Sequence, residues 1–250
     1  MTSPQVLYCG DTSLDSAAAY LAGLMTHWNM SFDYVPSDRD LPDSVFESAP
    51  GLIILSDYPS ERVSESQHSR IIDLVAHGTG LLMIGGWESF HGLGGDWDTT
   101  PIADVLPVAI SSSDDRCNCD CPVLVRPVGE SHSISDGLPW QSHPPLIGGF
   151  NRFTPKAGTD TVLEAVQFAA TADGDSFTFR ETASTPLLVT GRSGSGRTAA
   201  LATDVAPHWV GPLVDWGEER VTAQAQGTEG VEVGNLYAEL FHRIVSWCLA

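Results

Sequence analysis

The chain has 250 residues, 42% of them hydrophobic, which is enough apolar surface to form the buried core of a single domain. Its 12 basic and 32 acidic side chains give a formal charge of −20 at pH 7. Such a charge repels nucleic-acid backbones and anionic membrane surfaces, so neither is expected as a partner. Lys156 is the only lysine. This composition is typical of salt-adapted proteins, although an ordinary acidic cytosolic protein explains it equally well.

The sequence shows no sign of export or membrane insertion. The first residues, MTSPQVLYCGD, lack the basic segment of a secretory signal. No apolar run approaches the roughly 20 residues that a membrane-spanning helix requires. The five cysteines are an odd number without the spacing of a disulfide framework. We therefore expect a cytoplasmic protein with reduced thiols.

Strands and helices alternate through the first hundred residues. Apolar runs that are typical of buried strands occur at 5–9, 52–56 and 81–84, and a shorter strand is expected at 31–36. Helices are expected over 13–28, with Ser13 as N-cap, and over 64–78, closed by Gly78. The alternation predicts an α/β fold with a doubly wound, mostly parallel sheet flanked by helices, of the flavodoxin-like type.

The alternation stops beyond Pro101. Residues about 111–145 are rich in Cys, Ser and Asp, and we expect an irregular extension with short strands there. Two apolar runs around a Ser-Gly-Ser-Gly turn predict a β-hairpin over 186–204. A C-terminal helix is expected from residue 234, with one buried face made by Leu236, Leu240, Ile244 and Trp247. We expect one domain over residues 1–250.

A glycine-rich loop follows the apolar run at 81–84. Gly85 and Gly86 permit a tight turn and a close approach of the backbone to a ligand. Chemically active side chains follow within a few residues: Trp87, Glu88, Ser89 and His91. Ligands of parallel sheets bind outside the carboxyl ends of the strands, so this loop is a candidate site.

Four stretches in this order carry a family resemblance. They are LIILSDYP, LLMIGGWESFHGLGG with TPIADVLPV, PLLVTGRSGSGRTAALATD, and APHW. They resemble the putative glutamine amidotransferase-like family, an uncharacterised branch of the class I glutamine amidotransferase superfamily. The resemblance spans most of the chain and implies the class I amidotransferase-like fold.

The resemblance also implies where a glutaminase would keep its nucleophile. In active members a cysteine stands at the turn that here reads Gly85 and Gly86, but the sequence has no cysteine between Cys9 and Cys117. His208 lies near the place of the family's histidine, followed by Trp209 rather than by the Pro and Glu of that motif. A glutaminase needs an activated thiolate, so glutamine hydrolysis is not expected.

The candidate residues fall into two groups, and no metal-ligand or cofactor set is predicted. Acid–base roles are assigned to Glu88, Asp204 and His208. A triad of Ser89, His208 and Asp204 lacks the Gly-x-Ser-x-Gly setting of an exposed serine. Ligand-binding roles are assigned to the residues that follow the strands or line the glycine loop, namely Asp11, Asp57, Gly85, Gly86, Trp87, Ser89, His91 and Trp209. Loop capping or core packing is the competing role for each.

Cys117, Cys119 and Cys121 alternate along the chain. On a flat strand the neighbouring cysteines would lie roughly 6.5 to 7 Å apart, too far for adjacent sulfurs to share one ion at about 2.3 Å each. A curled backbone would be needed for a metal or redox site. A half-buried strand of small apolar thiols is the alternative.

We expect an amidotransferase-like protein without glutaminase activity that binds a small polar molecule in the vestigial active-site cleft. A hydrolase or carbohydrate-processing enzyme that uses Glu88, Asp204 and His208 is the first alternative. The second is a non-catalytic structural or assembly protein, and homo-oligomers are compatible with each of the three.

Overall fold

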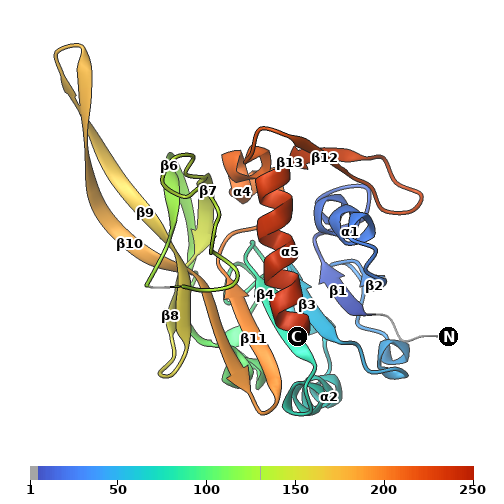
Figure 1. Ribbon diagram of the computed structural model, residues 1–250. Helices are drawn as coiled ribbons and strands as arrows, with labels where there is room; N and C mark the ends of the chain where they lie inside the picture. The colour runs from blue at the N-terminus through green and yellow to red at the C-terminus, as the bar shows by residue number, and fades with distance from the viewer. Residues whose placement is uncertain (1–4, 130) are drawn as a thin grey trace.

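A nine-stranded sheet forms the centre of the computed structural model, which describes residues 5–129 and 131–250 (Figure 1). In spatial order its strands are β2 (Phe32–Val35), β1 (Val6–Gly10), β3 (Leu52–Ser56), β4 (Gly80–Ile84), β11 (Gly196–Leu201), β10 (Ser176–Ser193), β9 (Asp160–Asp173), β6 (Arg116–Pro127) and β7 (Leu146–Asn151).

The half of the sheet that contains β2, β1, β3, β4 and β11 is parallel. Every residue of β1, β3 and β4 is buried, which is why these segments read as unbroken apolar runs. The predicted parallel arrangement of these three strands is confirmed, and all of their carboxyl ends lie at one edge of the sheet.

The other half is antiparallel, so the predicted α/β sheet flanked by helices is present and is mixed. The expected hairpin is present as β10 and β11, which pair from Leu188–Leu201 to Ser193–Gly196. The stretch expected to be irregular holds the twelve-residue strand β6, which pairs with β7 and β9. The far ends of β9 and β10 project from the body as a long two-stranded arm (Figure 1).

Three main helices pack on the sheet: α1 (Ala18–His27), α2 (Glu65–Ala76) and α5 (Asn235–Leu249). From β1 the chain crosses through α1 to β2 on one side, and from β3 through α2 to β4 on the other. Right-handed crossovers in opposite directions place α1 and α2 on opposite faces, so the sheet is doubly wound. Helix α5 contacts α1 and runs along β3, β4 and β11.

Two helix predictions need correction. Helix α1 begins at Ala18 rather than after Ser13, because the Ser13 hydroxyl lies 3.0 Å from that of Ser16 in a preceding turn. In α5 the buried face is centred on Tyr237, Leu240, Phe241 and Ile244. Leu236 and Trp247 are only partly buried. Helix α2 agrees with its prediction and has a capping box between Ser64 and Gln67.

Short elements complete the molecule. They are η1 (Asp43–Phe46), η2 (Ser60–Arg62), η3 (Trp97–Thr99), α3 (Ile102–Val105), α4 (Pro207–Val210), η4 (Gly211–Asp215) and the strand pairs β5 (Val108–Ile110) with β8 (Phe153–Pro155) and β12 (Arg220–Ala223) with β13 (Val231–Gly234). In the described part of the chain, no helix has the length and apolar character needed to cross a bilayer.

Candidate functional site

Polar side chains gather where the parallel strands end. Asp11 follows β1 and Asp57 follows β3, and backbone bonds hold these turns to their neighbours. The Asp11 amide donates to the Ser56 carbonyl at 2.8 Å, and the Gly85 amide donates to the Leu201 carbonyl at 2.7 Å. The edge predicted from the strand order therefore exists, and the turns after β1, β3, β4 and β11 meet there.

Asp57 links the turn after β3 to the glycine loop after β4. Its φ of +46° is left-handed, a conformation that Asp tolerates better than most residues, and Asp11 shares it at +52°. One carboxylate oxygen of Asp57 accepts a hydrogen bond from the Glu88 amide at 2.6 Å. The Asp57 amide donates to the buried Ser89 hydroxyl at 2.9 Å. Ser89 is thus committed to a backbone bond, which opposes a nucleophilic role.

The Asp57 carboxylate also fills the space beside Gly86. A Cβ atom at Gly86 would lie 2.2 Å from Asp57 Oδ1, and one at Gly85 would lie 2.0 Å from the Ala202 carbonyl oxygen. Neither position accommodates a side chain without displacement of its neighbours. The glycines are therefore required by contact with surrounding groups, whatever ligand approaches the loop.

Two residues that sequence reasoning missed hold the loop in place. The Gly86 amide donates to Asn151 Oδ1 at 2.9 Å, and Asn151 Nδ2 donates to the Gly86 carbonyl and to Asp115. Asp115 in turn accepts hydrogen bonds from the His91 and Gly92 amides. Both Asn151 and Asp115 are buried polar residues that lie far from the loop in sequence. Their contacts with the loop become visible only in the structure, where buried polar groups are expected to be hydrogen-bonded.

Three carboxyl groups at the edge have a raised pKa. Burial raises the pKa of Asp57 to about 6, and burial together with the charge of Asp57 raises the pKa of Asp204 to about 7. The pKa of Asp11 is raised well above its usual range by burial, then by the charges of Asp204 and Asp57. Asp11 is hydrogen-bonded by the Tyr8 and Ser56 hydroxyls. The edge therefore carries protons near neutral pH, as functional sites often do.

An aromatic rim lies beside these groups. Trp87, 40% exposed, donates from its indole nitrogen to His208 Nε2 at 3.1 Å. The Arg116 guanidinium stacks over the indole with its carbon 4.6 Å from the ring centroid. The loops after β4 and β11 thus meet in direct contact, as the predicted common cleft requires.

The three residues assigned to acid–base roles do not form one contact group. One carboxylate oxygen of Asp204 accepts hydrogen bonds from the backbone amides of Val205 and Ala206. His208 is exposed and bound by Trp87. Burial raises the pKa of Glu88, and the positive charge of Arg62 in η2 opposes that rise.

Trp209 is an anchor of the core and not a wall of the cleft. Its side chain is 1% exposed, and its indole nitrogen donates to Asn118 Oδ1 at 2.6 Å. Gly149 of β7 leaves room for the ring, since a Cβ there would lie 2.4 Å from Trp209 Cδ1. The ligand-binding role expected for Trp209 is therefore replaced by packing.

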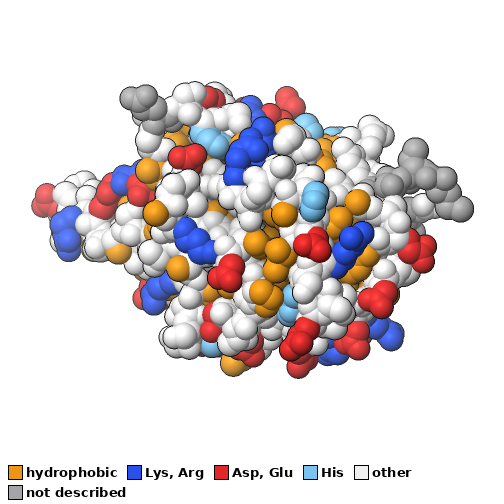
Figure 2. All heavy atoms as spheres, turned by 90° about the horizontal axis from the view of Figure 1, so that it is seen from below, with side chains coloured by type: hydrophobic (Ala, Val, Ile, Leu, Met, Phe, Trp, Pro, Cys, Tyr) orange, Lys and Arg blue, Asp and Glu red, His pale blue; other side chains and the backbone are white. Residues whose placement is uncertain are grey.

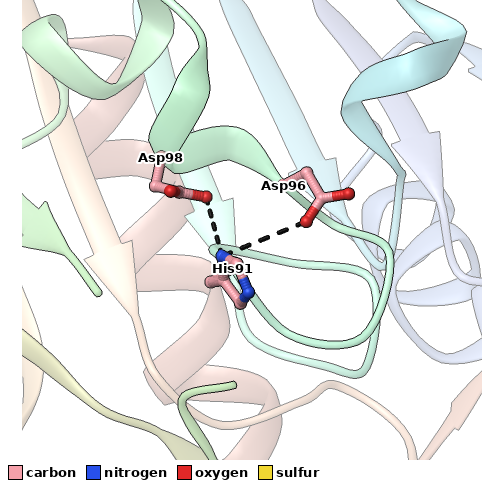
Figure 3. A group of neighbouring side chains, drawn as sticks. All are labelled: His91, Asp96 and Asp98. Carbon is pink, nitrogen blue, oxygen red and sulfur yellow. Dashed lines mark hydrogen bonds and ion pairs between the residues drawn. The ribbon is translucent and has the colours of Figure 1, made fainter. Parts of the chain in front are cut away.

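His91 belongs to a separate trio at the far end of the glycine loop (Figure 3). Its Nδ1 lies 2.8 Å from Asp98 and 4.0 Å from Asp96. The hydrogen bond that the imidazole donates to the Asp98 carboxylate raises the pKa of His91. These ligand-type side chains are close enough for a cation, but the bond to Asp98 already explains the position of the ring.

A hollow with a volume of about 850 Å³ lies away from the candidate site, bordered by β6 and the segment that contains Leu138, Trp140 and Pro144. None of its lining residues belongs to the carboxyl edge.

Comparisons with known proteins place this architecture. Residues 54–222 match the family described as "Putative glutamine amidotransferase". The structure of "Cytoplasmic Protein STM3548 from Salmonella typhimurium" is 23% identical over 98% of both chains, with a TM-score of 0.73. "Cytoplasmic Protein STM1381 from Salmonella typhimurium LT2" has the same identity and TM-score over 97% of this chain and 98% of its own.

More distant structures share the fold as well. The "mmIFT52 N-terminal domain" has a TM-score of 0.60 at 9% identity, over 97% of this chain and 96% of its own. At these identities the likeness establishes the fold alone. No curated protein matches the chain. Because the family match extends over more than half of the residues, the chain belongs to the GATase1_like family, described as putative glutamine amidotransferases.

Proposed function

We propose that this protein keeps the amidotransferase-like scaffold without glutaminase activity and binds a small, neutral, polyhydroxylated molecule at the carboxyl edge. The observation that carries the proposal is the Asp57 carboxylate, which stands 2.2 Å from where a Cβ at Gly86 would be. The Asp57 carboxylate, which accepts a hydrogen bond from the Glu88 amide, thus fills the space that a thiol nucleophile at Gly86 would need.

The chemistry of the missing thiol supports the first half of the proposal. The sequence has no cysteine between Cys9 and Cys117, and Cys9 is buried in β1 with its pKa raised by burial. A buried thiol without a nearby base is a poor nucleophile. Glycine supplies neither a nucleophile nor a proton relay.

The groups at the surface support the ligand class. Asp57 and Glu88 accept hydrogen bonds, Arg116 donates them, and the partly exposed Trp87 offers an apolar ring. A sugar-sized polyol both donates and accepts hydrogen bonds and packs its C–H groups on an aromatic face. A strongly anionic ligand would be repelled by the formal charge of −20 that the chain carries at pH 7.

Calorimetric titration with a panel of neutral mono- and disaccharides tests this proposal, with putrescine and citrate as cationic and anionic probes. At least one saccharide should bind saturably. Trp87→Ala and Glu88→Gln should each weaken that binding by about tenfold, equivalent to about 1.4 kcal/mol. Trp28→Phe, away from the edge beside His242, is the matched control and should bind as the wild type does.

Two results would contradict the ligand class. One is saturable binding of putrescine, but of no saccharide, that depends on Trp87 and Glu88. The other is saccharide binding that is equal in the wild type and in both edge variants.

Acid–base catalysis at the same edge is the second candidate, because a carboxyl group with a pKa near 7 suits proton transfer at neutral pH. Its test is turnover of a bound saccharide that is lost in Asp204→Asn. We further propose a cytoplasmic location, supported by the description of the Salmonella proteins and by five cysteines that are all free thiols.

A further inference from the structure

The alternating cysteines of β6 lie at an interruption of the strand pairing. Asn118 pairs with Gly149 and Val123 pairs with Ile147, so β6 takes five residues to cover what β7 covers in two. The residues between Asn118 and Val123 therefore bulge from the ladder. This is the curled backbone that a flat strand lacks.

The bulge brings two of the thiols together. The Sγ atoms of Cys117 and Cys119 are 4.0 Å apart, instead of the separation of a flat strand. Two sulfurs that each bind one metal ion at about 2.3 Å can lie at most about 4.6 Å apart, and the separation of this pair is within that limit. Sulfurs on a flat strand would be too distant to share an ion, and the interruption at Asn118–Val123 supplies the curled backbone that such a site requires.

The surrounding charges favour a monovalent ion. Arg152 Nη2 lies 3.1 Å from Cys117 Sγ. Two thiolates around a monovalent cation leave one negative charge, which the guanidinium offsets. A structural zinc site needs four ligands. In the described part of the chain, no cysteine belongs to a cluster of three or more His, Cys, Asp or Glu ligand atoms, so the ligands of a zinc site are not assembled here.

We propose that Cys117 and Cys119 form a two-thiolate site for a soft monovalent metal ion, Cu(I). Soft thiolate ligands select Cu(I). On binding, two S–Cu bonds form and two thiol protons pass to solvent, with no change of oxidation state. Cys119 is half-buried, so the ion has access from outside. The site is independent of the carboxyl edge and of the function proposed for it.

An anaerobic titration of the reduced protein with Cu(I), in competition with a chromogenic Cu(I) chelator, tests the site. The wild type should remove one equivalent of copper from the chelator. Cys117→Ser and Cys119→Ser should each lower the affinity by about 100-fold or more, since each removes half of the ligands. Cys121→Ser is the matched control, because it changes an exposed thiol of the same bulge, and it should bind copper as the wild type does.

X-ray absorption of the loaded protein should show sulfur ligands only. Far-UV circular dichroism of each variant establishes that it is folded, and Cys119→Ser addresses the case in which a change at the more buried Cys117 unfolds the chain. The proposal is overturned if the wild type takes no copper from the chelator, if folded Cys119→Ser binds as the wild type does, or if Cys121→Ser loses as much affinity as Cys117→Ser.

Discussion

Asp57 is the residue on which the interpretation of the site depends. It is held in a left-handed conformation directly after β3, and its carboxylate is bonded to the loop after β4. Strained residues of this kind cluster at ligand sites, and here the strain places a carboxylate where the family's thiol would need room. Burial raises the pKa of Asp57, Asp204 and Asp11, and the charges of neighbouring carboxylates add to the rise at Asp204 and Asp11.

The raised pKa of Asp204 predicts that the stability of the fold depends on pH. The folded-state pKa of Asp204 is raised to about 7, so the folded protein keeps a proton that the unfolded chain releases at a lower pH. Stability from this group is complete below the unfolded pKa and is lost as the pH rises through about 7. Asp204→Asn removes that loss while its amide oxygen still caps the turn.

Thermal unfolding at a series of pH values tests this. Between pH 5 and 7.5 the Tm of the wild type should fall by about 5 °C more than that of Asp204→Asn. The exposed Asp33 of β2 provides a control, and Asp33→Asn should follow the wild type. Parallel curves of Tm against pH for the wild type and Asp204→Asn would contradict this prediction, because they would show that Asp204 does not bind a proton in this range.

Among the helices and strands, the packing of α4 on β7 holds the loop that carries His208 in position. Trp209 fills the space left by Gly149 and donates to Asn118, which pairs with that glycine. Gly149→Ala should therefore cost about 2 kcal/mol of unfolding free energy through overpacking. At the neighbouring Gly148, an added Cβ would make only an ordinary van der Waals contact, 3.7 Å from the Trp209 carbonyl oxygen.

Urea unfolding of the two alanine variants compares these positions. Gly148→Ala should be within about 0.5 kcal/mol of the wild type, because alanine suits a strand better than glycine. Equal losses in both variants would mean that the two glycines serve backbone flexibility and not the fit of Trp209.

The elements differ in how well the sequence predicts them. β1, β3 and β4 are buried on both faces, so an apolar run specifies each of them almost to the residue. β6 is only partly buried and the outer part of β10 is exposed, and their polar residues resemble those of irregular chain. Topology was enough to bring Asp11, Asp57 and Gly86 to one edge. Asn151 and Asp115 reach the loop through pairings that no local pattern encodes.

At the scale of the whole molecule, the charge of −20 dominates the surface. Acidic side chains are scattered over the face shown in Figure 2, with basic ones between them. Like charges repel over the folded surface, and salt screens them over a Debye length of about 10 Å at 0.1 M. The Tm should therefore rise as sodium chloride is added from low to moderate concentration. A flat or falling Tm over that range would contradict the repulsion.

The proposed absence of glutaminase activity is tested by ammonia release from L-glutamine by the purified protein, with Glu88→Gln as the cleft variant and an active glutaminase as the assay control. No release above the buffer rate is expected, because a Cβ at Gly86 would lie 2.2 Å from Asp57 Oδ1 and the sequence has no cysteine between Cys9 and Cys117. A trace rate that is equal in the wild type and Glu88→Gln would belong to a contaminant. Release by the wild type that disappears in Glu88→Gln would contradict the account.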